Sequence, residues 1–137
     1  MRALALDPTN PMISFSVGLG YIHYALKRQS SNRQYLITQG LSFIFRYYHA
    51  HINSPDPGDR QAACFDVART FQLLGLHDIA EHFYQQSSAI AQSHPQDAPS
   101  MARADLSLHA AFNQWCAMMA RGNIVASDQI LRESLRL

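Results

Sequence analysis

Charged residues are scarce in this chain of 137 amino acids. They make up 15% of the sequence, against roughly 25% in ordinary globular domains, and the basic residues are ten Arg but only one Lys. The formal net charge is +1 with His neutral, so no strong overall field draws the chain to nucleic acid or anionic lipid. This balance excludes a basic DNA-clamping domain but not local Arg contacts. The hydrophobic fraction of 47% is enough for a continuous core.

Cysteines and long apolar runs are also few. Cys64 and Cys116 lie in helix-like apolar segments without a CxxC pair, so we expect both to be buried small hydrophobic residues in a reducing compartment. The longest uncharged run, residues 12–26, is shorter than the roughly 20 apolar residues of a membrane-spanning helix. The apolar stretch before Asp7 is too short for a signal peptide. We therefore expect a soluble, intracellular chain.

Motifs for catalysis, metals and cofactors are missing. Gly18 and Gly20 form a GxG without a third glycine or a preceding strand, so close helix packing explains both better than a nucleotide loop does. The seven His do not have zinc-ligand spacing, and His49 and His51 would point to different faces of a helix. There is no GxSxG motif, and the carboxylates are scattered. We expect no enzyme, no cofactor, no metal site and no small-molecule substrate.

Helical periodicity dominates, whereas hairpin turns and sustained alternation, the signals of strands, are nearly absent. Prolines and glycine mark a loop at residues 53–59, and a second loop is expected at 93–99. Gly75 and Gly122 suit the left-handed position that follows a helix C-terminus. The pattern predicts an all-α chain of three helical hairpins, with helices over residues 12–28, 32–51, 60–74, 77–92, 100–121 and 124–136.

Residues 64–84 match the tetratricopeptide pattern of large and small positions. Small residues let two antiparallel helices approach closely, and large residues fill the groove beside them. The residues expected to pack the repeats are Ala3, Pro8, Val67, Ala68, Phe71, Gly75, Ala80, Tyr84 and Gly122.

The repeat pattern divides the chain into four segments. We expect the end of a preceding repeat at 1–8, a long helical hairpin at 9–52, a tetratricopeptide repeat at 60–92 and a C-terminal tetratricopeptide-like hairpin at 99–137. Because one such hairpin cannot bury its apolar face alone, the hairpins are expected to stack as part of an α-solenoid. The first segment resembles the second half of a repeat, so we expect the chain to be a fragment of a longer array whose main activity is binding.

Arginines alternate with tyrosines between residues 25 and 48. Both side chains make large amphipathic contacts that are common at interfaces. A second interpretation stays open, in which Lys27 and Arg28 complement the dipole at a helix C-terminus and the tyrosines fill the hairpin core. The candidate partner-binding residues are Arg28, Asn32, Arg33, Tyr35, Arg46, Tyr47 and Tyr48.

The same segments resemble a known family. The series ALKRQ at 25–29, NRQY at 32–35, QG at 39–40 and FRYY at 45–48 is similar to the C-terminal region of the tetratricopeptide subunit of transcription factor IIIC (TFIIIC), in its fungal form. The similarity continues in register to Gly122 and Asn123. The chain departs from the family at His109, where an acid is usual, at Gln114, where leucine is usual, and at Ser127, where the repeat prefers alanine. These departures bear on the packing of the last hairpin.

The resemblance implies a nuclear, non-enzymatic assembly factor for RNA polymerase III. In that family the subunit belongs to the part of TFIIIC that holds the A-box side of the internal promoter, and its repeats help to position transcription factor IIIB (TFIIIB) at genes for tRNA and other small RNAs. The implied partners are other TFIIIC subunits and TFIIIB components, with promoter DNA contacted indirectly.

Two other binding functions and a helical enzyme stay open as alternatives. One is a tetratricopeptide adaptor for an unrelated protein or peptide client, against which the low Lys content argues. Another is direct DNA contact through Arg28, Arg33 and Arg46. The lack of a catalytic constellation argues against an enzyme.

Overall fold

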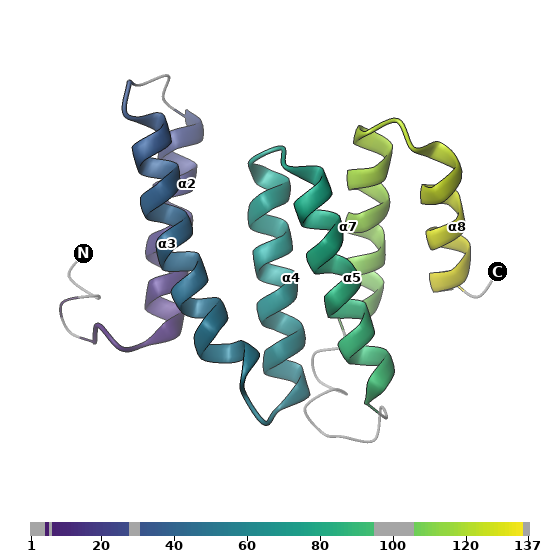
Figure 1. Cartoon of the computed structure of the whole chain (residues 1–137), viewed down its shortest axis with the longest axis horizontal. Coiled ribbons are helices and arrows are strands. Elements are labelled where there is room, and N and C mark those ends of the chain that lie inside the picture. The colour runs from purple at the N-terminus through teal and green to yellow at the C-terminus, as the bar shows by residue number, and fades with distance from the viewer. Residues whose placement is uncertain (1–4, 6, 28–30, 95–105, 136–137) are drawn as a thin grey trace. The chain divides into compact units, whose positions relative to one another are not determined.

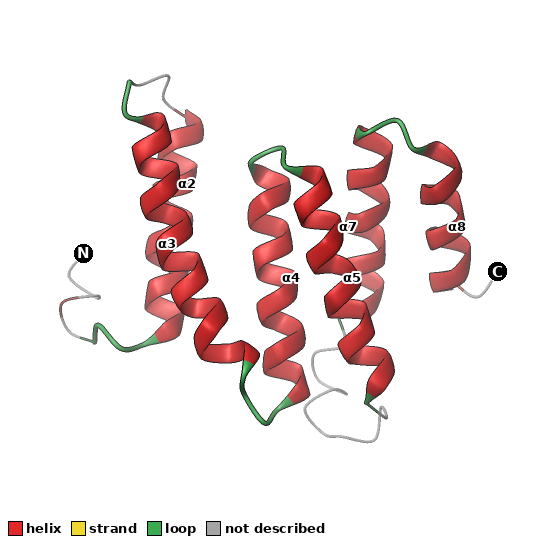
Figure 2. Cartoon of the chain, viewed as in Figure 1, coloured by secondary structure: helices red, strands yellow, loops and turns green. Residues whose placement is uncertain are grey.

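The computed structural model describes Ala5 and residues 7–27, 31–94 and 106–135, and all the elements in these ranges are helices (Figures 1 and 2). The chain divides into two compact units, Met1–His51 and Ile52–Leu137, which are described separately. Both units consist of helical hairpins, which confirms the predicted all-α, tetratricopeptide-like fold. The helices are α2 (Pro11–Lys27), α3 (Arg33–Ile52), α4 (Pro57–Leu73), α5 (His77–Ser93), α7 (Ser107–Ala120) and α8 (Ile124–Leu135).

Helix α4 begins three residues earlier than the sequence pattern predicted. Asp56 has an extended backbone and its carboxylate accepts a hydrogen bond of 2.9 Å from the Gly58 N–H, so it caps the helix. Pro57 occupies the first helical position, where its missing N–H costs nothing. The expected loop at 53–59 is therefore shorter. The expected start of the fifth helix at residue 100 lies outside the described residues.

In the first unit, α2 and α3 form an antiparallel hairpin with close backbone contact. A Cβ atom on Gly18 would lie 2.8 Å from the carbonyl oxygen of Gly40, and one on Gly40 would lie 2.7 Å from Cγ1 of Ile22. Neither glycine has room for a side chain. Gly20, by contrast, has no atom within 4 Å of its would-be Cβ, so the expectation that both glycines of the GxG serve close packing is wrong for Gly20.

Aromatic pairs also join the two helices of this hairpin. The rings of Phe15 and Tyr47 have centroids 4.7 Å apart, and those of Tyr21 and Phe43 stack at 5.9 Å. Phe15, early in α2, pairs with Tyr47, late in α3, whereas Tyr21, later in α2, pairs with the earlier Phe43. This order is the one that an antiparallel register requires. The small residues therefore set the helix spacing, and the rings fill the space beside it.

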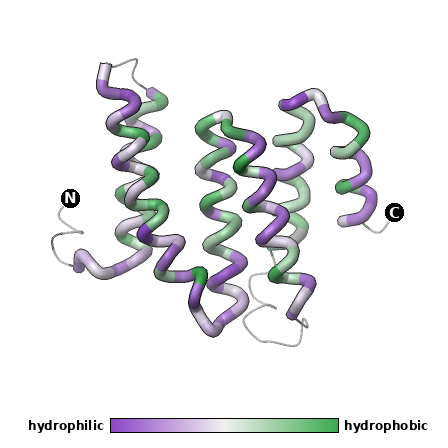
Figure 3. Tube along the Cα trace, viewed as in Figure 1, coloured by the Kyte–Doolittle hydropathy of each residue, from purple (hydrophilic) through white to green (hydrophobic). Residues whose placement is uncertain are grey.

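In the second unit, α5 contacts both α4 and α7, and α7 contacts α8, so two hairpins stack against each other. Helix α4 is buried on several sides, and hydrophobic residues recur along it (Figure 3). Fully buried small residues line α4 and α5, and the Ser87 hydroxyl of α5 donates to the Gln61 carbonyl of α4 at 3.2 Å. Among the expected packing residues, Val67, Ala68, Phe71, Ala80 and Tyr84 are buried. Pro8 is exposed before α2, and Ala3 lies outside the described residues.

The two hairpins of this unit turn in the same way. Gly75 has φ +76° and Gly122 has φ +77°, values at which L side chains are strained. Leu76 N–H donates to the Phe71 carbonyl at 2.9 Å, and Asn123 N–H donates to the Met118 carbonyl at 3.0 Å. Both turns are therefore Schellman motifs, which satisfy the last carbonyls of α4 and α7.

Two of the departures from the family lie in buried positions of the last hairpin. Ser127, in the position where the repeat prefers alanine, is fully buried, and its hydroxyl donates to the Ile124 carbonyl at 2.7 Å. Gln114 is 5% exposed, whereas His109 is exposed. The small size of Ser127 and its local hydrogen bond allow α8 to pack without an unsatisfied polar group there.

The two cysteines differ in burial. Cys64 is fully buried in α4, and burial raises the pKa of its thiol to about 11. Cys116 is only half-buried in α7. Cys64 therefore behaves as a small core residue, as expected from the sequence, while Cys116 is more accessible than expected.

Tyr84 connects three helices of the second unit. Its side chain is fully buried in α5, its hydroxyl donates to the Gln72 side-chain oxygen of α4 at 2.6 Å, and it also hydrogen-bonds Asn113 of α7. Burial raises the pKa of the Tyr84 phenol, an effect that the Asn113 hydrogen bond opposes. The phenol is thus held neutral at the junction of the two hairpins.

Substitution of the tight glycines should destabilise the first unit. We expect Gly18→Ala and Gly40→Ala each to lower the free energy of unfolding by about 1–3 kcal/mol, because the added methyl group must displace backbone or Ile22. Gly20→Ala is the matched control. It adds the same methyl group in open space in the same helix, so it should stabilise by about 0.4–1 kcal/mol. Denaturant unfolding followed by circular dichroism measures all three, and equal effects at Gly18 and Gly20 would contradict the close approach.

Removal of the Tyr84 hydroxyl should loosen the second unit. Tyr84→Phe keeps the ring but leaves the Gln72 and Asn113 side chains without this partner, so we expect a loss of about 1–2 kcal/mol in unfolding free energy. Tyr35→Phe is the control, because Tyr35 is 63% exposed and loses little with its hydroxyl. A Tyr84→Phe chain as stable as the wild type would show that the hydrogen bonds contribute nothing net.

Candidate interaction surfaces

The structure separates the predicted partner-binding residues into exposed and buried sets. Asn32, Arg33, Tyr35 and Arg46 are exposed on α3 or just before it. Tyr48 is half-buried, with its ring edge-on to Phe45 at a centroid distance of 6.1 Å. Arg28 lies outside the described residues.

Tyr47 is a correction to the predicted surface. Its side chain is only 3% exposed, and its ring lies 4.7 Å from Phe15 and 4.8 Å from His51, centroid to centroid. Residues Gly40, Ile44 and Tyr47 follow the i, i+4, i+7 spacing of one buried stripe. For Tyr47 the alternative interpretation holds, in which a tyrosine fills the hairpin core.

Five of the exposed residues of α3 form one stripe along the helix. Tyr35, Thr38, Ser42, Arg46 and His49 are all exposed and follow one another at three- and four-residue intervals, so they lie on the same side. The Arg46 guanidinium lies 5.4 Å from the centroid of the Phe43 ring, which itself stacks on Tyr21. This cation–π contact orients Arg46 on the hairpin surface.

Carboxylates are absent from the α2–α3 hairpin. Residues 8–55 contain no Asp or Glu, although Lys27, Arg28, Arg33 and Arg46 fall within them. Of these, Lys27, Arg33 and Arg46 are exposed and form no ion pair with any residue in the described ranges. The surface therefore presents cations and a tyrosine without a neutralising partner of its own.

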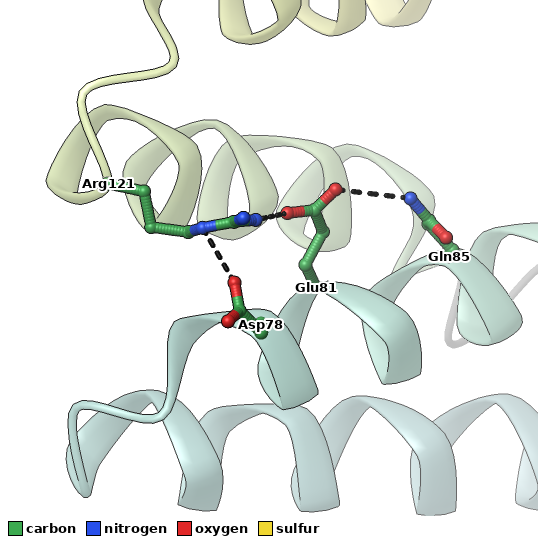
Figure 4. A network of polar contacts seen from close by, with 4 residues as sticks. All are labelled: Asp78, Glu81, Gln85 and Arg121. Carbon is green, nitrogen blue, oxygen red and sulfur yellow. Dashed lines mark hydrogen bonds and ion pairs between the residues drawn. The ribbon is translucent and has the colours of Figure 1, made fainter.

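A second polar cluster, which the sequence pattern did not reveal, links the two hairpins of the second unit. Arg121, at the end of α7, binds Asp78 through Nε and Glu81 through a terminal guanidinium nitrogen, both at 2.7 Å (Figure 4). Gln85 donates to the other Glu81 oxygen at 3.3 Å. Arg121 and Asp78 also line an open hollow of about 260 Å³ together with Gly75, Leu76, His77 and Ile79.

Local sequence features could indicate the acid of this cluster but not its arginine partner. An acid in the first turn of α5 is favoured by the helix dipole wherever that helix lies. The partner of Asp78 and Glu81 stands about forty residues later, and nothing local selects Arg121 among the arginines. The pairing follows from the stacking of α7 on α5.

Arg121 should couple the hairpins mainly through Glu81. The Glu81 side chain is 15% exposed and that of Asp78 is 77% exposed, so solvent screens Asp78 more strongly. A double-mutant cycle of Arg121→Gln with Glu81→Gln should give a coupling of about 1 kcal/mol in unfolding free energy. The matched cycle with Asp78→Asn should give only a few tenths. A larger coupling to Asp78 than to Glu81 would contradict this order.

Apolar side chains are also exposed on the last hairpin. Leu108, Phe112 and Met119 recur at helical spacing along α7 with exposures of 57%, 54% and 39%, and Val125 of α8 is 83% exposed. An apolar stripe of this kind is typical of a protein contact surface.

No candidate metal centre accompanies these surfaces in the part of the chain that the structure describes. No group of three His, Cys, Asp or Glu side chains there converges as metal ligands would. No described helix is long and apolar enough to cross a membrane.

Comparison with known proteins identifies relatives of one kind. Transcription factor tau subunit sfc4 of Schizosaccharomyces pombe is 30% identical over 135 residues, which cover 94% of this chain. The transcription factor tau 131 kDa subunit of Saccharomyces cerevisiae is 26% identical over 95% of the chain. General transcription factor 3C polypeptide 3 of Homo sapiens is 33% identical over 64% of it.

The chain is homologous to part of a TFIIIC subunit. This confirms the resemblance found in the sequence, and the matches to the two yeast proteins run through both units. The chain spans only 13%, 12% and 9% of the lengths of these three relatives. No protein-family model matches the chain.

Proposed function

We propose that the chain is a non-catalytic protein-interaction region of a TFIIIC subunit that acts in the nucleus. In this role it supports assembly of TFIIIC on internal promoters and recruits TFIIIB for transcription of tRNA and other small RNA genes by RNA polymerase III. The observation that carries the proposal is the similarity to three transcription factor subunits over most of the chain. Its partners are other TFIIIC subunits and TFIIIB components, and contact with promoter DNA is indirect.

The architecture supports a scaffold. Helical hairpins hold exposed side chains at fixed spacing. The exposed stripe on α3 and the exposed apolar side chains of α7 offer the amphipathic contacts on which protein interfaces depend. We further propose that 60–92 and 99–137 are successive repeats of an array, with 9–52 as a longer hairpin and 1–8 as the end of a preceding repeat. The matching turns at Gly75 and Gly122 support the assignment of 60–92 and 99–137 as two similar hairpins.

Direct DNA contact is the second candidate function. The absence of carboxylates from residues 8–55 favours it, since acids would repel phosphate. The isoelectric point of about 7.9 argues against it, because domains with a nucleic-acid footprint are usually far more basic. A generic tetratricopeptide adaptor for an unrelated client is the remaining alternative.

The proposal is tested by capture of purified subunits. A tagged chain of residues 1–137 is mixed with recombinant TFIIIC and TFIIIB subunits, next to the variant Arg33→Glu/Tyr35→Ala. Both side chains are exposed, so the variant should remain folded by circular dichroism. We expect the wild-type chain to retain at least one subunit and the variant to bind it at least about tenfold more weakly, a loss of roughly 1.4 kcal/mol.

The control variant is Arg132→Glu/Leu135→Ala, which makes similar changes on exposed positions of α8. It should retain the subunit as the wild type does. A folded wild-type chain that retains no TFIIIC or TFIIIB subunit would contradict the proposal and favour an unrelated client. Retention of duplex DNA instead, with an affinity that falls steeply with salt, would favour direct DNA contact.

A further inference from the structure

The near-zero net charge of the chain conceals two units of opposite sign. The first unit, residues 1–51, contains five Lys or Arg and a single acid, Asp7, whereas the second, residues 52–137, contains six Arg and nine acids. In a surface adapted for solubility alone, charges of both signs are interspersed. Their segregation here indicates that the first unit meets a partner of the opposite sign.

The exposed cations of the first unit occupy two places on the hairpin. Lys27 ends α2 and Arg33 begins α3, so in an antiparallel hairpin they lie at the same end. Tyr35 and Arg46 are eleven residues apart on α3, close to three turns, and therefore share one side of the helix. Tyr35 is 63% exposed. We define the basic hairpin surface as Lys27, Asn32, Arg33, Tyr35 and Arg46.

The chemistry of this surface favours a protein over a nucleic acid. Phosphate backbones bind to dense basic patches, whereas Lys27, Arg33 and Arg46 are spread along the hairpin. Arg and Tyr, by contrast, are the residues enriched at the centres of protein interfaces. The Arg46 guanidinium lies over the Phe43 ring at 5.4 Å, and a guanidinium is the side-chain group best suited to bidentate contact with a carboxylate.

We propose that the basic hairpin surface binds an acidic segment of a partner protein, one in which Asp or Glu alternates with apolar or aromatic residues. The carboxylates pair with Lys27, Arg33 and Arg46, and the apolar residues cover Tyr35. This proposal rests on the proposed function, because it assigns a chemistry to the partner that the scaffold holds.

The only lysine of the chain allows a direct test, because Lys27 lies on this surface. A carbodiimide joins a carboxylate to a lysine amine only when the two are in contact: it activates the carboxylate, the amine displaces the activated group to form the amide, and the carbodiimide leaves as its urea. The probe is a short fluorescein-labelled peptide of alternating Glu and Phe, compared with the same peptide in which Gln replaces Glu. Both are mixed with the 137-residue chain, and binding is followed by anisotropy. Cross-links are then mapped to the Lys27 peptide by mass spectrometry.

We expect the Glu peptide to bind at least about tenfold more tightly than the Gln peptide and to cross-link to Lys27. Lys27→Arg should keep the affinity and lose the cross-link. Arg33→Gln/Arg46→Gln should weaken binding by about tenfold, whereas Arg69→Gln/Arg132→Gln, which removes two exposed arginines of the second unit, should not. Equal binding of both peptides, equal loss in both double variants, or displacement of the peptide by duplex DNA would each overturn the proposal.

The same variants separate this proposal from the proposed function. If TFIIIC or TFIIIB subunits are retained equally by the wild type and by Arg33→Gln/Arg46→Gln, and carbodiimide joins none of their carboxylates to Lys27, the proposed function stands and the acidic-segment proposal fails. If the folded chain retains none of these subunits but binds the Glu peptide as described, the proposed function fails and the acidic-segment proposal stands.

Discussion

Close approach of antiparallel helices is the constraint on which both units depend. In the first unit the backbones of Gly18 and Gly40 are so near that neither residue can carry a Cβ atom. That spacing brings Phe15 to Tyr47 and Tyr21 to Phe43 across the hairpin. In the second unit the fully buried small residues Ala63 and Ala68 of α4 and Ala80 and Ser87 of α5 line the two helices of one hairpin. Large residues in these positions would move the helices apart and leave the aromatic side chains without partners. The small residues therefore set the distance between the helices of each hairpin.

The helices themselves could be predicted from the sequence, because their hydrogen bonds and their apolar periodicity are local. The predictions were wrong where a single residue determines a helix boundary or which side chain is buried. Asp56 and Pro57 resemble a loop, yet they cap and begin α4. Tyr47 and Tyr48 lie at i+3 and i+4 from the buried Ile44, so both fit a buried stripe. The helix that packs against them selects Tyr47 for the core. Gly18 and Gly20 likewise differ only in which side of α2 faces α3.

Contacts between hairpins could not be predicted, because they join residues far apart in the chain. Arg121 reaches Asp78 and Glu81 only because α7 lies against α5. Tyr84 finds Gln72 on one side and Asn113 on the other for the same reason. Polar groups of this kind stabilise little when exposed, but the buried Tyr84 phenol of α5 has partners in α4 and α7 and so joins the two hairpins of the second unit. Polar contacts that join α4, α5 and α7 thus add to the apolar packing between the two hairpins of the second unit.

A helical hairpin places buried and exposed residues next to each other in sequence. On α3, Tyr47 is buried against α2 while Arg46, its neighbour, is exposed and held by Phe43. One step along a helix rotates a side chain by about 100°, which is enough to exchange the core for the solvent. The run FRYY that carries the family resemblance thus contains both kinds of residue. The two roles are coupled, because the packing of the buried Tyr47 against α2 sets the rotation of α3 and with it the direction in which Arg46 is exposed.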